Sequence, residues 1–159
     1  MKLTNKVAIV TGGSRDIGRA VSIKLALEGA KVVVNYFHNK AEADETLRLI
    51  AEAGGTAIAV QGDMTKGDDV NHLFEECAKA FGDNIDILVN VAGGIVGRKK
   101  ITEQDEEWYD TLMNVNMKSV WFCTRAAVPH MKAGASIVNF SSLAARDGGG
   151  AGASLYATS

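Results

Sequence analysis

Five short apolar runs recur along the chain, and longer segments of helical period separate them. The runs are rich in β-branched residues and read VAIVT (7–11), KVVVN (31–35), AIAVQ (57–61), IDILVN (85–90) and SIVNFS (136–141). Polar and apolar residues do not alternate within them, which is typical of strands buried on both faces. Helices are expected at 17–29, 40–53, 67–81 and 105–132. This alternation predicts an α/β fold, a doubly wound parallel sheet with helices on both faces.

Glycines and the single proline indicate where these helices end. Gly29, Gly54 and Gly55 follow the first two helical segments, and Pro129 lies near the end of the longest one. No internal repeat, low-complexity tract or linker interrupts the pattern. We therefore expect residues 1–159 to form a single domain.

Composition excludes several classes of function. The 159 residues carry a net charge of −2, which gives no electrostatic basis for binding nucleic acid or an anionic membrane. No stretch approaches the ~20 apolar residues that span a bilayer, and the first residues lack the features of a signal peptide. Cys77 and Cys123 lie far apart, so neither a metal site nor a disulfide is indicated. We expect a reduced, cytoplasmic protein.

The segment TGGSRDIGRA (11–20) directly follows the first strand and opens the first helix. In this context glycines allow the backbone to approach a pyrophosphate, and the helix N-terminus offers free N–H groups and a positive dipole end. The alternative is a tight strand-to-helix turn without a ligand. The strand–turn–helix context favours a dinucleotide site.

The glycine spacing differs from the usual GxGxxG, because Gly12 and Gly18 are six residues apart. It resembles TGxxxGxG, the fingerprint of the short-chain dehydrogenase/reductase family. Further segments resemble motifs of that family in the same order: NVAG (90–93), NVNMKSV (114–120), NFSSLAA (139–145) and YATS (156–159). The resemblance covers the whole chain. It implies a Rossmann-like sheet of strand order 3-2-1-4-5 that lacks the family's last two strands, with 3-oxoacyl-carrier-protein reductases among the relatives.

The resemblance also implies roles for single residues. Asn116, Ser142 and Tyr156 match the catalytic asparagine, serine and tyrosine, and Asp63 matches a residue that contacts adenine. The resemblance and the arguments below together predict these cofactor-binding residues: Gly12, Ser14, Arg15, Asp16, Ile17, Gly18, Asn35, Asp63, Met64, Asn90, Ala92 and Gly93.

Asp16 departs from the family pattern, which has a glycine at this position. A carboxylate near a pyrophosphate repels it, yet aspartate is also a good N-cap residue. We expect Asp16 to cap the first helix and to leave the N–H groups of Ile17 and Gly18 for the phosphates. The alternative is a weakened cofactor site.

The sequence after the second strand bears on the choice of cofactor. NAD-binding sites usually place a carboxylate there, whereas this chain reads VVVNYFHNK and has no acidic residue before Glu42. Asn35 occupies the discriminating position in this interpretation. Arg15 lies in the glycine loop, where a guanidinium suits a phosphate, and His38 or Lys40 could add to it. We therefore predict NADP(H) rather than NAD(H).

The resemblance implies hydride transfer between nicotinamide and a carbonyl or secondary alcohol, possibly a 3-oxoacyl thioester. Tyr156 would exchange the proton, Ser142 would hold the substrate oxygen, and Asn116 would hold a water of the proton relay. Two alternatives remain: a catalytically silent NADP-binding module or inactive fragment, and an epimerase or dehydratase, whose glycine spacing usually differs.

The family's lysine belongs at the position after Ser159. We therefore expect residues 1–159 to be the N-terminal part of a longer single-domain enzyme, poorly active as they stand. The run SIVNFS would then be an exposed edge strand.

Two segments, 94–105 and 146–154, should overhang the active site. The first holds Arg98, Lys99 and Lys100, which either dock an acidic acyl-carrier protein or form a solvated loop. The long helix carries Trp108, Trp121 and Phe122, whose apolar surface favours a homodimer or homotetramer of the complete protein.

Overall fold

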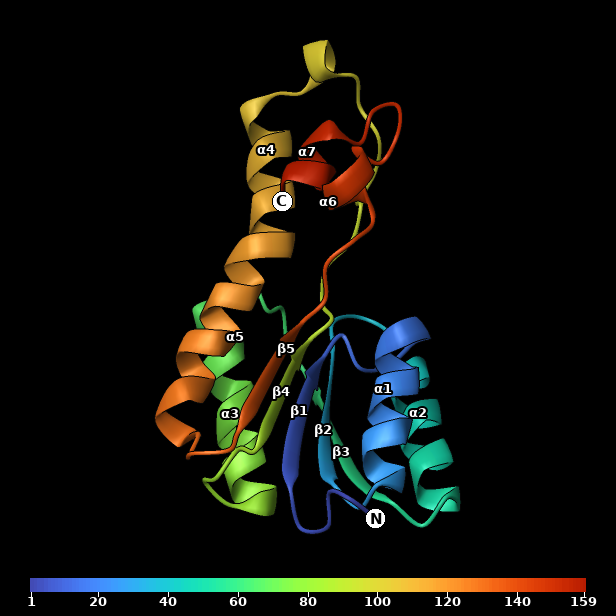
Figure 1. The fold of residues 1–159 in the computed structure, drawn as a ribbon, viewed down its shortest axis with the longest axis vertical. Coiled ribbons are helices and arrows are strands. Elements are labelled where there is room, and N and C mark those ends of the chain that lie inside the picture. Colours follow the sequence, from blue (N-terminus) through green and yellow to red (C-terminus); the bar gives the residue numbers. More distant parts are fainter.

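The computed structural model describes residues 1–159 as an α/β fold around a five-stranded parallel sheet (Figure 1). The strand order is β3-β2-β1-β4-β5, as predicted. The strands are β1 (Val7–Thr11), β2 (Lys31–Tyr36), β3 (Thr56–Gln61), β4 (Ile87–Asn90) and β5 (Ser136–Asn139).

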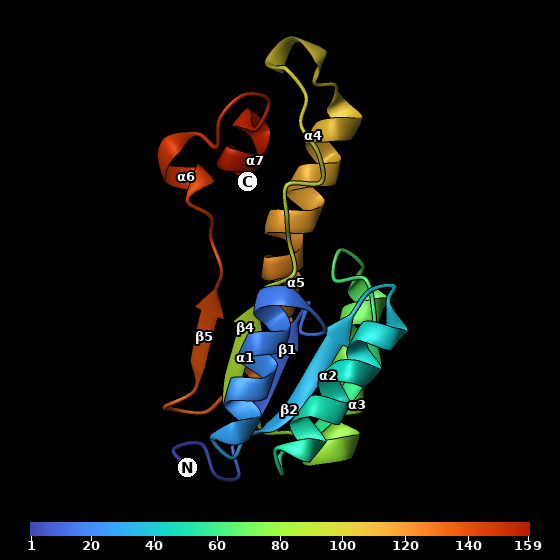
Figure 2. The same cartoon turned by 90° about the vertical axis from the view of Figure 1, so that its right-hand side faces the viewer.

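Helices cover both faces of the sheet (Figure 2). On one face lie α1 (Asp16–Leu27) and α2 (Lys40–Glu52), and on the other lie α3 (Gly67–Phe81) and α5 (Ser119–Ala127). Side chains alternate along a strand, so neighbouring residues of β1 enter different cores. Ile9 packs with the α3 and α5 side, whereas Val10 packs with the α1 and α2 side, and both are fully buried. This explains why the strand sequences are apolar throughout.

The long helix expected at 105–132 is helical throughout 106–130, but its helix type changes along the way. It comprises α4 (Glu106–Met113), a π-helical turn η2 (Asn114–Lys118), α5 and the 3-10 turn η3 (Val128–His130). Asp105 caps α4 by accepting the Trp108 N–H at 2.8 Å. Pro129 lies in η3, where the α-helix has already ended. Turns of π-helix inside α-helices are frequent at functional sites.

A small lobe extends beyond the carboxyl ends of the strands (Figure 1). It contains α4, the 3-10 turn η1 (Ile101–Glu103) and two short helices, α6 (Ala144–Asp147) and α7 (Ser154–Thr158). The sequence pattern did not predict α6 or η1. Segments 94–105 and 146–154 both lie in this lobe.

β5 forms one edge of the sheet, as predicted, and all four of its residues are exposed. An apolar groove of about 440 Å³ runs between α1 and β5, with Val21, Leu25 and Val138 in its lining. None of the helices combines the length and apolarity needed to cross a membrane.

Candidate functional site

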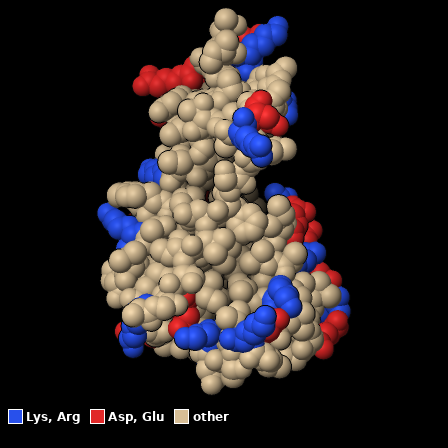
Figure 3. All heavy atoms as spheres, in the orientation of Figure 1, with Lys and Arg blue, Asp and Glu red and all other residues tan.

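A cavity of about 500 Å³ opens at the carboxyl ends of β1, β2, β3 and β4. The space-filling view in Figure 3 shows that the molecule narrows between the sheet and the small lobe. In doubly wound folds this crevice, outside the carboxyl ends of the strands, is where ligands bind. Eleven of the predicted cofactor residues line it: Gly12, Ser14, Arg15, Asp16, Ile17, Gly18, Asn35, Asp63, Met64, Ala92 and Gly93.

The glycine loop is packed so tightly that a side chain has no room at Gly18 and would be crowded and strained at Gly12. A Cβ on Gly18 would lie 2.0 Å from the carbonyl oxygen of Gly12, so α1 can approach the loop only with glycine there. Gly12 has a φ of +60°, and a Cβ on it would lie 3.1 Å from the backbone of Ala92. This packing brings the first turn of α1, whose N–H groups have no acceptors within the helix, to the cavity.

A polar network behind the loop holds it in place. Thr46 of α2 donates its hydroxyl to the Ser14 carbonyl at 2.7 Å, and Arg19 donates to the same carbonyl at 3.2 Å. The Arg19 guanidinium also contacts the Thr46 hydroxyl and the carboxylate of Glu42. No pattern in the sequence indicated Thr46, Arg19 or Glu42, because their role depends on the packing of α1 against α2.

The capping role predicted for Asp16 is wrong. The residue before it, Arg15, is the N-cap of α1, and the Asp16 carboxylate accepts no N–H. Asp16 instead adopts a left-handed φ of +48°, a conformation that favours glycine and that aspartate tolerates. Its side chain is 81% exposed and lies 3.6 Å from the Arg15 guanidinium. The family's glycine therefore belongs here for backbone reasons.

Asn35 has a structural role that the sequence interpretation missed. Its side chain accepts the Gly12 N–H at 3.1 Å and donates to the Gly62 carbonyl at 3.0 Å. The residue is only 2% exposed. Its amide therefore fixes the glycine loop to the end of β3 and is not free to read a ribose. The buried, hydrogen-bonded amide of Asn35 therefore does not fit the discriminating role predicted for it.

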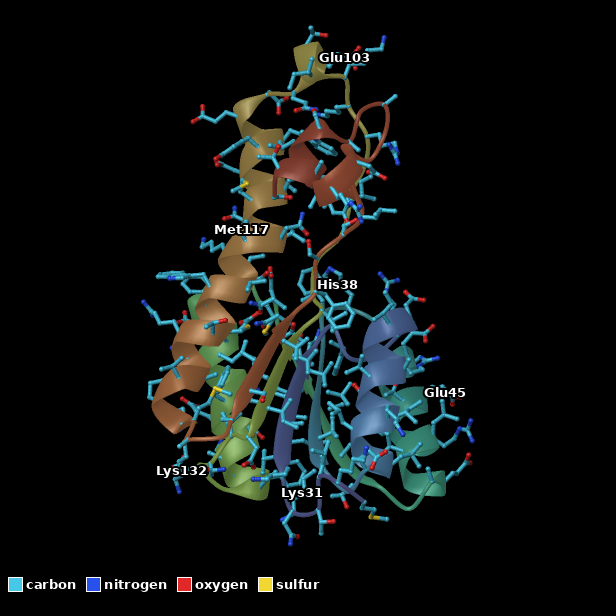
Figure 4. All side chains as sticks on the ribbon, viewed as in Figure 1. Lys31, His38, Glu45, Glu103, Met117 and Lys132 are labelled. Carbon is cyan, nitrogen blue, oxygen red and sulfur yellow. The ribbon has the colours of Figure 1, made fainter.

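Those following residues, Tyr36 to Asn39, line the cavity wall. The rings of Phe37 and His38 lie 3.5 Å apart, centroid to centroid. Figure 4 labels His38 at the carboxyl end of the sheet, below the small lobe. The wall contains no carboxylate between β2 and α2, as the sequence indicated.

The NVAG segment is attached to β1 by Thr11. Its hydroxyl accepts the N–H groups of Val91 and Ala92, each at 3.1 Å. Asn90 does not line the cavity, contrary to the prediction: it is 2% exposed and donates to the Asn139 side chain at 2.8 Å. Asn90 therefore joins β4 to β5.

The third strand contributes Asp63 and Met64. Asp63 accepts both the N–H and the hydroxyl of Thr65, at 3.0 and 2.8 Å, which orders the loop before α3. Met64 is buried, and its sulfur lies 3.6 Å from the sulfur of Cys123. Burial raises the pKa of the Cys123 thiol to about 12 and that of Cys77 to about 11. Neither cysteine therefore supplies a thiolate nucleophile near neutral pH.

Asn116 lies in the π-helical turn and faces the segment after NVAG. Its side-chain oxygen accepts the Gly94 N–H at 2.8 Å, and its amide donates to the Gly94 carbonyl at 3.2 Å. The same amide donates to the Ser159 hydroxyl at 2.9 Å. The neighbouring residues Val115 and Ser119 line the cavity. Asn116 thus connects the cavity to the lobe that carries α7.

Ser142 and Tyr156 lie in the lobe, at either end of the segment that holds α6 and the glycine-rich loop. Both are half-buried. The Ser142 hydroxyl accepts the Ala144 N–H at 3.2 Å, and Tyr156 lies in α7, one turn before Ser159. Neither residue lines the cavity itself. The hydrogen bond between Asn116 and Ser159 joins the π-helical turn to the end of α7, the helix that carries Tyr156.

Comparisons with known proteins agree with this arrangement. The sequence profile described as short chain dehydrogenase matches residues 6–159. The chain belongs to the short-chain dehydrogenase/reductase family. It is 40% identical to the hydroxynaphthalene reductase-like protein Arp2 of Metarhizium robertsii over 99% of this chain and 58% of that protein. It is 35% identical to the 3-oxoacyl-[acyl-carrier-protein] reductase FabG of Staphylococcus epidermidis over 97% of this chain and 63% of that protein.

Solved structures of the family superpose closely on the fold. A short-chain dehydrogenase/reductase from Serratia marcescens is 33% identical and matches with a TM-score of 0.94, covering 99% of this chain and 64% of that one. An NADH-dependent reductase A1-R' complexed with NAD is 36% identical, with a TM-score of 0.92 and coverage of 98% and 67%. The chain spans less than two thirds of the length of the curated relatives described here.

Proposed function

We propose that residues 1–159 are the dinucleotide-binding part of a single-domain oxidoreductase that interconverts a carbonyl compound and a secondary alcohol with NADP(H). The observation that carries the proposal is the cavity over the glycine loop, which reaches Asn116 through Gly93 and Gly94. Family membership supports the reaction class. A nicotinamide dinucleotide supplies hydride transfer when it is bound, and the protein supplies its position and the surrounding charge.

The residues present fit the diphosphate of such a cofactor. Gly12 and Gly18 let the loop and the start of α1 approach each other, and Ser14, Arg15 and Ile17 line the space in front of them. Asp63 and Met64, which follow β3, also line the cavity, and an adenine would lie against them. Ser142 would hold the substrate oxygen and Tyr156 would exchange a proton with it, because these residues match the catalytic serine and tyrosine of the family.

Arg15 supports a preference for NADP(H). Its side chain is 73% exposed and has only Asp16 as an ionic partner, at 3.6 Å. The wall formed by residues 35–39 has no carboxylate to hydrogen-bond a ribose 2′-hydroxyl. A 2′-phosphate beside Arg15 would gain a charge-assisted hydrogen bond. The NADH-dependent relative makes a direct comparison of both cofactors necessary.

A 3-oxoacyl thioester is the substrate class to test first, because the FabG relative acts on that class by its name. An acyl-carrier protein as partner has less support from the basic run. Lys99 lies 4.6 Å over the Trp108 ring and Lys100 lies 3.7 Å from Glu103, so these charges already have partners. For the complete protein a homo-oligomer remains our proposal, and the 55% exposed Trp121 on α5 supports it.

Binding of the two cofactors by the Arg15→Ala variant tests the cofactor proposal. We expect its Kd for NADPH, measured by fluorescence titration, to rise about 10- to 100-fold, because a hydrogen bond to a charged group contributes about 1.5–3 kcal/mol. Its Kd for NADH should stay within about twofold. Arg48→Ala on α2, which pairs only with Glu45 and Glu52, is the matched control. Equal losses for both cofactors would contradict the assignment.

Turnover tests the reaction class. The protein at its natural length should oxidise NADPH in the presence of acetoacetyl thioesters or other ketones, and Tyr156→Phe should abolish this without changing the Kd for NADPH. A protein that binds NADPH but turns over none of a broad carbonyl panel would instead be a silent cofactor-binding module.

A further inference from the structure

The glycine-rich loop between α6 and α7 is fastened to the segment after β4 by one side chain. Arg98 reaches across the small lobe, and its Nη1 donates to the carbonyl of Gly149 at 3.0 Å and to the carbonyl of Ala151 at 2.8 Å. In Figure 1 the two segments run together in the lobe, the loop in red and the segment after β4 in yellow-green.

Two further contacts flank this bridge. The Lys99 N–H donates to the Gly152 carbonyl at 3.2 Å, and Gln104 donates to the Ser154 hydroxyl, also at 3.2 Å. A Cβ on Gly152 would lie 3.2 Å from the Arg98 Cβ, so the two backbones meet with little space between them. The two segments therefore contact each other through backbone as well as through the Arg98 side chain.

The loop has little stiffness of its own. Gly148, Gly149, Gly150 and Gly152 all have φ between +67° and +84°, which glycine adopts readily but does not favour over its other conformations. Within the loop only one backbone hydrogen bond is made, from Ala153 to Gly150 at 3.2 Å. Beyond that bond, the loop is held by the Asp147 carboxylate, which accepts the Gly149 N–H at 2.8 Å, and by the contacts that segment 98–104 supplies.

The loop also separates the two residues proposed for the chemistry. Ser142 lies before α6, Tyr156 lies in α7, and residues 148–153 connect these helices. We propose that Arg98 is a positioning residue: by holding the carbonyls of Gly149 and Ala151 it sets where α7, and with it Tyr156, lies relative to Ser142. The Arg98 side chain makes its hydrogen bonds to Gly149 and Ala151 and to neither Ser142 nor Tyr156. This inference rests on the proposed function only for its effect on turnover.

Amide hydrogen exchange of the protein at its natural length tests the fastening without requiring activity. Arg98→Met keeps the aliphatic stem and removes the guanidinium. We expect exchange of the amides in 148–158, covering both the loop and α7, to quicken about 10-fold or more. The matched control is Lys100→Met, which removes a neighbouring charge whose only ionic partner is Glu103 and should leave these rates unchanged. The Kd for NADPH of both variants should stay within twofold of the wild type, which shows that the sheet and the glycine loop are intact.

Each result decides the proposal. Exchange in 148–158 within twofold of the wild type for Arg98→Met would overturn it, and so would a faster loop with unchanged α7. Where the wild type reduces a carbonyl substrate, Arg98→Met should lower kcat about 10-fold or more, with a smaller change in KM, and Arg98→Lys should recover only part of the loss. An unchanged kcat would overturn the positioning role. A wild type that shows the Arg98-dependent exchange but no turnover would contradict the proposed function while the fastening stands.

Discussion

Replacing Asn35 by aspartate separates a cofactor-reading role from a structural one. If position 35 contacted the ribose, a carboxylate there would favour NADH. In the structure, however, the Asn35 side chain is buried and its Nδ2 donates to the Gly62 carbonyl at 3.0 Å, with the Val60 and Tyr36 carbonyls at 3.4 Å. An ionised carboxylate would face these three oxygens without a donor. We therefore expect Asn35→Asp to destabilise the fold and not to change the cofactor preference.

The magnitude follows from protonation. The introduced carboxyl can satisfy the Gly62 carbonyl only when it carries a proton, and its unfolded-state pKa is about 3.9. Keeping it protonated at pH 7, about three units higher, costs up to about 4 kcal/mol at 1.36 kcal/mol per unit, and at pH 5 about 1.5 kcal/mol. The sign follows because the folded-state pKa is raised. The variant is closest to wild-type stability below pH 4, and its deficit grows as the pH rises toward that folded-state pKa.

Urea unfolding followed by circular dichroism at pH 5 and pH 7 measures this deficit in the free energy of unfolding. The matched control is Asn71→Asp on α3, because the Asn71 side chain is exposed and lies outside the cavity. We expect that control to stay within about 0.5 kcal/mol of the wild type. An Asn35→Asp variant with wild-type stability at both pH values, or with a clear shift toward NADH, would refute the structural role assigned here.

Two further substitutions test the glycine loop. Gly18→Ala places a methyl 2.0 Å from the Gly12 carbonyl oxygen, so α1 must move away from the loop. We expect urea unfolding to show a destabilisation of about 1–3 kcal/mol, and binding of NADPH to weaken at least 10-fold. A variant that binds NADPH normally would show that the close approach is dispensable. Asp16→Gly relieves the strain of a left-handed φ and removes a carboxylate from beside Arg15. We therefore expect NADPH to bind about 3–10-fold more tightly, with a smaller gain for NADH. No gain for either cofactor would mean that the carboxylate lies away from the bound phosphates.

The sequence pattern alone determined the strands and the main helices, and the resemblance to the family predicted the order in which the strands pair. Apolar runs such as VAIVT can only be satisfied between two layers of helices, and β1 indeed sends Ile9 into one core and Val10 into the other. Eleven of the twelve predicted cofactor residues line one cavity, because the carboxyl ends of parallel strands meet at one edge. The sequence carries this information because the cofactor residues lie at the end of a strand or in the segment that directly follows one.

The tertiary structure decided what side chains at those positions do. Asn35 and Asn90 lie at positions where the sequence predicts cofactor contacts, yet both are buried. The Asn35 amide bonds the backbone of the glycine loop, and the Asn90 amide bonds Asn139 on the next strand. Asp16 was expected to cap α1, but the glycine loop enters the helix with a positive φ that turns its carboxylate to solvent. The network of Arg19 with Thr46 and the bridge from Arg98 to Gly149 join residues 27 and 51 positions apart. Such contacts depend on how helices and loops pack after the chain has folded back on itself, and no local pattern encodes them.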